Sequence, residues 1–83
     1  MPYERLKQAR RKTIGTKQTA KAISRGLAKL VYIARDAEER VVADLVTQCE
    51  AMNVPVTYVD FMTDLGRACG IEVGAAACAV LEE

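Results

Sequence analysis

Apolar and polar positions alternate along the chain in two rhythms, which predict helices and strands in turn. The short apolar runs at 30–34 and 56–59 suit strands, and the first is nearly continuous, as expected of a strand covered on both faces. Apolar residues recur at helical spacing in 16–25, in 41–52 and after Asp60. A short leading helix is expected over 3–10, with Leu6 and Ala9 facing inward, before a brief extended piece at 13–14.

The helix predicted over 16–25 has signals at both ends. Thr16 suits the N-cap position, and Gly26 stands where a left-handed residue commonly ends a helix. Ala20, Ile23 and Leu27 are expected on its buried side, because they follow one another at helical spacing.

The two later helices are bounded in a similar way. Asp36 is expected to cap the first, with Glu39 completing a capping-box-like pattern. Asp60 is expected to open the second, and Gly70 to end it. The predicted apolar stripes are Val41, Val42, Leu45, Val46, Cys49 and Met52 on the first helix, which Asn53 and Pro55 end, and Leu65, Ala68 and Cys69 on the second.

The segment 75–81 fits either a helix or a strand, because it is apolar throughout. We favour a strand, since it follows a helix in an alternating chain and ends in apolar branched residues. Alternation of this kind places helices on both faces of a small sheet. The sequence therefore predicts a single α/β domain over 1–83, a three-layer α/β/α sandwich around a small mixed sheet of about four strands.

Few catalytic chemistries are open to this chain. It has no His and one Ser, Ser24, so a nucleophile with its activating base cannot be assembled in the usual way. The sequence Gly15-Thr16-Lys17 resembles part of a phosphate loop, but that motif needs a second glycine directly before the lysine. We expect no enzymatic activity, no catalytic residue and no cofactor.

The three cysteines, Cys49, Cys69 and Cys78, are widely spaced. Because no His is present to complete a zinc site, we interpret them as buried, reduced, small apolar residues and expect no metal site. A redox or metal role is the alternative. Neither a signal peptide nor the ~20 apolar residues of a membrane span are evident, so we expect a cytoplasmic protein without a membrane partner.

A net charge of +1 conceals two oppositely charged halves. Residues 1–35 hold ten of the twelve Lys and Arg residues and one acidic residue, which gives +9. Residues 36–83 hold two basic and ten acidic residues, which gives −8. A basic half of this kind attracts polyanions, and association through it weakens as the salt concentration rises.

Within the basic half, Lys17, Lys21 and Arg25 are spaced to form one exposed stripe roughly 12 Å long on the helix 16–25. A solvated face is the ordinary explanation of such a stripe. Nucleic acid is favoured here because a glycine turn places Thr16 to Gln18 at a helix N-terminus, where backbone N–H groups attract anions. The cations outside this stripe are Arg5, Lys7, Arg10, Arg11, Lys12, Lys29 and Arg35.

Aromatic residues are too few for the stacking platforms that bind single-stranded nucleic acid. Of four aromatics, Tyr32 and Tyr58 fall in strands that are predicted to be buried. A shaped, largely paired RNA is therefore the better candidate.

Several segments together resemble a known family. They are 14–21 (Ile-Gly-Thr-Lys-Gln-Thr-Ala-Lys), Arg25-Gly26, 30–36 (Leu-Val-Tyr-Ile-Ala-Arg-Asp) and 65–73 (Leu-Gly-Arg-Ala-Cys-Gly-Ile-Glu-Val). In this order they resemble the kink-turn RNA-binding family of ribosomal proteins L-seven-Ae and L-thirty-e, above all its small bacterial YbxF-type members. The resemblance covers nearly the whole chain. It implies an L-thirty-e-like α/β/α sandwich that binds a sharply bent RNA helix with tandem sheared G·A pairs beside a short bulge.

The resemblance also implies which residues meet the RNA. Two sets of residues are implied. One set, at the start of the helix 16–25, would enter the groove that the bend opens, with lysines at guanine O6/N7 or nearby phosphates. The other set, in the turn after Gly70, would lie against the splayed nucleotides of the loop. Without the resemblance, the turn at 71–73 is ordinarily a solvent loop with two apolar residues tucked inward. Archaeal members commonly have Asn-Glu where this chain has Lys-Gln, so a carboxylate is replaced by a neutral amide. The two sets are Gly15, Thr16, Lys17, Gln18 and Lys21, and Ile71, Glu72 and Val73.

The sequence thus predicts a non-enzymatic, monomeric RNA-binding protein that stabilises kink-turns in a ribosomal RNA, a riboswitch or another leader RNA. The alternative is a protein-interaction module whose positive face docks an acidic partner.

Overall fold

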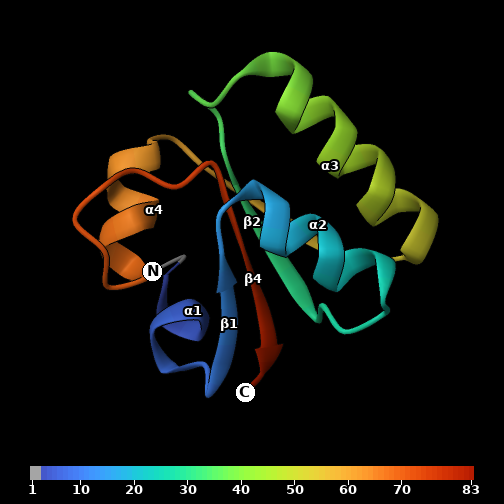
Figure 1. The fold of residues 1–83 in the computed structure, drawn as a ribbon. Helices are drawn as coiled ribbons and strands as arrows, with labels where there is room; N and C mark the ends of the chain where they lie inside the picture. The colour runs from blue at the N-terminus through green and yellow to red at the C-terminus, as the bar shows by residue number, and fades with distance from the viewer. Residues whose placement is uncertain (1–2) are drawn as a thin grey trace.

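The computed structural model describes residues 3–83 and contains four helices and four strands within them. Each strand ends close to where the next helix begins, so the alternation expected from the sequence is present (Figure 1). The elements are α1 (Glu4–Gln8), β1 (Arg11–Ile14), α2 (Thr16–Ser24), β2 (Leu30–Ala34), α3 (Glu39–Met52), β3 (Val56–Val59), α4 (Met62–Ala68) and β4 (Ala77–Glu82).

The four strands form one mixed sheet in the order β1-β4-β2-β3. Strand β4 is antiparallel to both of its neighbours, with Cys78 opposite Ile14 on one side and opposite Tyr32 on the other. Strands β2 and β3 are parallel. The mixed sheet of four strands is therefore confirmed, and the segment predicted at 75–81 forms a strand rather than a helix, although β4 begins only at Ala77. Because β2 and β4 are central, they carry most of the buried strand residues.

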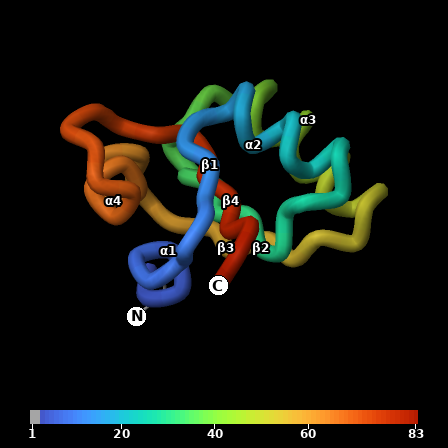
Figure 2. The backbone as a smooth tube through the Cα atoms, turned by 60° about the horizontal axis from the view of Figure 1, so that its bottom comes forward, coloured from blue at the N-terminus to red at the C-terminus, as the bar shows by residue number. Residues whose placement is uncertain are grey.

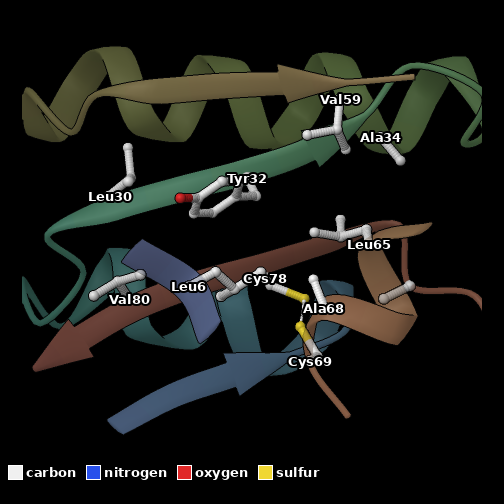
Figure 3. Close-up of a cluster of buried hydrophobic side chains, with 11 residues drawn as sticks. Leu6, Leu30, Tyr32, Ala34, Val59, Leu65, Ala68, Cys69, Cys78 and Val80 are labelled. Atoms are coloured by element: carbon white, nitrogen blue, oxygen red, sulfur yellow. Dashed lines mark hydrogen bonds between the residues drawn. The ribbon is translucent and has the colours of Figure 1, made fainter. Parts of the chain in front are cut away.

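Helices cover both faces of this sheet (Figure 2). On one face α2 and α3 contribute Ile23, Leu45 and Cys49 to a core with Val31 and Ile33 of β2. On the other face α1 and α4 pack on the sheet around a second core, which Figure 3 shows and which consists of Leu6, Leu30, Tyr32, Ala34, Val59, Leu65, Ala68, Cys69, Ala75, Cys78 and Val80. The predicted three-layer α/β/α sandwich is confirmed.

The helix caps differ from those predicted. Gly15, not Thr16, occupies the N-cap position of α2, and Thr16 is the first helical residue. Helix α3 begins at Glu39 with Glu38 as its N-cap, and it has no side-chain cap. The carboxylate of Asp36 instead accepts a hydrogen bond of 2.8 Å from the backbone N–H of Met62, the first residue of α4. Folding brings this N–H within reach of Asp36, which therefore serves a helix that lies 26 positions away.

Three other predictions for the helices and strands are wrong. Asp60 lies two residues before the first residue of α4, and Phe61 holds the N-cap position of that helix. Leu27 and Tyr58 were expected to be buried but are 50% and 40% exposed. Helix α2 ends at Ser24 and the chain turns at Gly26, so Leu27 leaves the buried face of the helix. Tyr58 is exposed because β3 is an edge strand, and the guanidinium of Arg35 lies 4.8 Å from its ring centroid.

The predicted helix ends are better matched than the starts. Gly26 and Gly70 have positive φ angles of 71° and 84°, and Asn53 at the end of α3 has φ 56°. The left-handed conformation closes a helix by turning the chain away from its axis, and glycine adopts it without steric cost.

Candidate nucleic-acid interface

The turn that leads into α2 and the segment that leads into β4 lie side by side at the edge of the sheet where β1 and β2 end and β4 begins. The N–H of Gly15 donates a hydrogen bond of 2.8 Å to the carbonyl of Ala77, and the N–H of Ala34 donates one of 2.9 Å to the carbonyl of Ala76. Figure 1 shows both segments at the same end of β1, β4 and β2. The chain that carries the second predicted element, 71–73, therefore continues to the edge where the first element, 15–21, begins, although 49 residues separate Lys21 from Ile71 along the chain.

Gly15 gives this edge its shape. Its backbone has φ 95° and ψ 162°, a combination that glycine adopts and residues with a Cβ strongly avoid. A Cβ at this position would meet nothing within 4 Å, so the requirement for glycine comes from the backbone and not from crowding. The turn directs α2 away from β1 and leaves the first N–H groups of the helix without a side-chain cap.

A hydrogen-bonded pair of threonines anchors the start of α2. The hydroxyl oxygens of Thr13 on β1 and Thr19 on α2 lie 2.8 Å apart and share a hydrogen bond. The N–H of Ala79 on β4 also donates to the Thr13 hydroxyl, at 3.2 Å. Thr19 is completely buried, and it is the one buried polar side chain among the described residues. Sequence reasoning missed this pair, because a threonine in an amphipathic helix carries no local sign that its partner lies on a strand.

The cations of α2 face solvent beside a hollow. Lys17, Gln18 and Lys21 are all exposed. Gln18 and Lys21 line a hollow of about 280 Å³ between α2 and β1, whereas Lys17 lies outside it. Arg25 lines the same hollow, so the predicted stripe is continued sideways by the basic residues of β1, Arg11 and Lys12. The two ion pairs of residues 3–83 lie elsewhere, Arg5 with Glu83 and Arg35 with Asp60, so the α2 cations are unpaired within this part of the chain.

The turn at 71–73 projects its middle and last residues. Val73 is 70% exposed and Glu72 is also exposed, while Ile71 is half-buried and packs against the core. Of the two apolar residues, only Ile71 is tucked inward. The exposed Val73 therefore leaves an apolar side chain on the outer surface of this turn.

Helix α4 holds this turn at close range. The N–H of Ile71 donates to the carbonyl of Gly66, and the N–H of Ala75 donates to the carbonyl of Met62, both at 3.0 Å. A Cβ on Gly66 would lie 2.0 Å from the carbonyl oxygen of Val73, which no real Cβ could tolerate. Gly66 lies within α4, and glycine is needed there because the turn passes directly over the helix.

The comparisons with known proteins agree with this architecture. Residues 3–83 match the profile of the ribosomal protein L7Ae/L30e/S12e/Gadd45 family. The chain belongs to this family. The resemblance noted in the sequence is therefore confirmed.

Named relatives extend over almost the whole chain. RNA-binding protein YbxF of Geobacillus stearothermophilus is 47% identical over 81 residues, which are 98% of this chain and 99% of the relative. An RNA-binding protein of Geobacillus thermodenitrificans is 46% identical with the same coverage. Among solved structures, a 15.5kD RNA binding protein of Giardia lamblia matches with a TM-score of 0.82 and 32% identity. That match covers 92% of this chain and spans 62% of the Giardia protein.

Residues 3–83 contain no helix long and apolar enough to cross a membrane. In the same range, no group of three or more His, Cys, Asp and Glu side chains is placed to hold a metal ion.

Proposed function

We propose that this protein binds RNA without catalysing a reaction and recognises kink-turns, as the family resemblance implies. The observation that carries the proposal is the edge of the sheet where an uncapped, cationic helix start meets the segment that leads from an exposed apolar turn into β4. Relatives that match almost the whole chain are named RNA-binding proteins, which supports RNA as the ligand.

In this proposal the start of α2 binds the RNA by charge and by hydrogen bonds. The N–H groups of the first helical turn offer donors to a phosphate, and the positive end of the helix dipole favours its charge. Lys17 and Lys21 meet guanine O6/N7 or phosphates, and Gln18 offers an amide to a base edge. Regular A-form RNA keeps its major groove too narrow for side chains, so this helix requires an RNA in which a bend has opened the groove.

The turn at 71–73 selects the shape of the RNA. Val73 and Ile71 offer apolar surface to nucleotides that are splayed out of the stack, and an unbent duplex presents no such nucleotides. Glu72 repels phosphates but can accept hydrogen bonds from base N–H groups. Because the bent conformer makes contacts with both elements and the straight conformer with one, binding shifts the RNA population toward the bend.

A pair of matched RNA duplexes tests this proposal. One carries tandem G·A pairs beside a three-nucleotide bulge, and the other has the same length and bulge with Watson–Crick pairs in place of the G·A pairs. We expect much tighter binding of the first at near-physiological salt, together with a fall in the end-to-end distance of the RNA by fluorescence transfer. Equal affinity for the two duplexes would refute kink-turn recognition, and the absence of any binding would refute RNA as the ligand.

Substitution of Lys21 tests the site itself. Because Lys21 is exposed and makes no ion pair, Lys21→Ala should leave the free energy of unfolding within about 0.5 kcal/mol of wild type. We expect it to weaken RNA binding by about 1–3 kcal/mol if Lys21 contacts a base, or to lower the salt dependence by about one ion if it contacts a phosphate. Lys29→Ala is the matched control, because it removes the same charge at the opposite edge of the sheet, before β2. Equal effects of the two substitutions would mean that only net charge matters.

A further inference from the structure

Two of the three cysteines lie against each other beneath the candidate interface. All three are buried and unpaired, as expected from the sequence. The sulfur atoms of Cys69 and Cys78 are 2.7 Å apart (Figure 3). Cys69 follows the last residue of α4 and directly precedes the turn that carries 71–73, and Cys78 lies on β4 beside β1. Cys49 belongs to the core on the other face of the sheet, so it cannot reach this pair.

The separation of the two sulfurs is only about 0.7 Å longer than a disulfide bond. Both backbones are held in place, one by the hydrogen bonds that close α4 and the other by the centre of the sheet. A bond between the sulfurs therefore needs a small side-chain adjustment and no rearrangement of the fold.

The surroundings make the two thiols unequal. A hydrogen bond from Cys78 lowers the pKa of Cys69, and the charge of Lys12 acts in the same direction, although burial opposes both. The same hydrogen bond and burial raise the pKa of Cys78. Cys69 is 7% exposed and Cys78 is fully buried. Cys69 is thus the more reactive and more accessible sulfur, and Cys78 is a neighbouring thiol placed to resolve an oxidised Cys69.

We propose that Cys69 and Cys78 are a redox site, which a hydroperoxide converts to an intramolecular disulfide and a small thiol converts back. In the first step the Cys69 thiolate attacks the peroxide, the O–O bond breaks, and sulfenic acid and hydroxide form. The Cys78 sulfur then attacks the Cys69 sulfur and breaks its S–O bond. The hydroxyl that is displaced takes the thiol proton of Cys78 and leaves as water. Two protein thiols and one hydrogen peroxide thereby yield one disulfide and two waters. Two molecules of a small thiol return both cysteines to the reduced state and become a disulfide themselves.

The disulfide would close a short loop that contains the whole turn. Residues 70–77 lie between the two cysteines, so the bond ties the end of α4 to β4 and restricts 71–73 to the arrangement described above. A cross-link over so short a loop stabilises the folded chain by restricting the unfolded one. Any effect of this disulfide on RNA binding rests on the proposed function. The disulfide itself can be tested without RNA, so the failure of either proposal can be told from the failure of the other.

Peptide mass mapping of the oxidised wild-type chain tests the site directly. The reduced protein is treated with hydrogen peroxide, alkylated with N-ethylmaleimide in denaturant and cleaved with trypsin. Cleavage after Arg40 and Arg67 leaves Cys49 in 41–67 and both other cysteines in 68–83. We expect 68–83 to be unalkylated and two hydrogen atoms lighter, and 41–67 to remain alkylated. Two alkylated thiols in 68–83, sulfinic or sulfonic acid at Cys69, or a link between the two peptides would overturn the proposal.

Two variants and a melting experiment complete the test. Cys78→Ala removes the resolving thiol, so dimedone should trap a sulfenic acid at Cys69, whereas Cys49→Ala should form the disulfide as the wild type does. The melting temperature of the wild type should rise by about 10 °C on oxidation and return when dithiothreitol is added. An unchanged melting temperature in a chain that has formed the disulfide would overturn the expected stabilisation.

Discussion

Gly15→Ala isolates the backbone conformation that starts α2. No atom lies within 4 Å of the position that the new Cβ would take, so the methyl group adds no clash. The cost comes from holding a residue with a Cβ at φ 95° and ψ 162°, a strain of about 1–3 kcal/mol. Alanine also restricts the unfolded chain, which offsets roughly 0.4–1 kcal/mol of that strain.

We therefore expect Gly15→Ala to lower the free energy of unfolding by about 1–2 kcal/mol, and urea titration at constant pH measures the change. The melting temperature should fall by roughly 4–8 °C for each kcal/mol in a domain of this size. Under conditions where the variant is folded, it should also bind kink-turn RNA more weakly, since the turn places the first N–H groups of α2.

Two controls separate strain from other causes. Gly26→Ala introduces alanine at φ 71° at the far end of α2, so it should cost stability and leave RNA affinity unchanged. Chemical synthesis with d-alanine at position 15 places the methyl group on the other side of the backbone, where a positive φ is unstrained. The d-alanine protein should recover most of the stability. Equal stabilities of the L- and d-alanine proteins would refute the argument from strain.

Three further substitutions test how the edge is built. Thr19→Val removes a buried hydroxyl and leaves its partner on β1 short of a hydrogen bond, so urea denaturation should show a loss of about 1–3 kcal/mol. Gly66→Ala forces a methyl group into the carbonyl of Val73; we expect roughly 3 kcal/mol of destabilisation, with the largest NMR shift changes in the turn at 71–73. Asp36→Ala removes the acceptor of the Met62 N–H and should cost about 1 kcal/mol, with faster hydrogen exchange at Met62. An unchanged exchange rate at that amide would contradict the capping role.

The order of helices and strands was accessible from the sequence because burial leaves a strong local pattern. The apolar run 30–34 became β2, which is buried along its whole length, and the run 56–59 coincides with β3. Glycines that must adopt positive φ were recognisable at helix ends, as Gly26 and Gly70 show. Polar residues near helix starts were less informative, since the carboxylate of Asp36 accepts its hydrogen bond from the N–H of Met62 on another helix, which only folding brings close.

The sequence by itself determined the layers of the fold, its charge asymmetry and the two segments expected to meet RNA, because periodicity, composition and short motifs are local properties. Only the tertiary structure decided that the start of the first segment meets the chain that leads on from the second, through the hydrogen bond from Gly15 to Ala77. It also decided that position 66 has no room for a side chain beside the carbonyl of Val73, and that the sulfurs of Cys69 and Cys78 are in contact. Strand order and pairing register bring such residues together, and they depend on contacts between distant parts of the chain that no local pattern records.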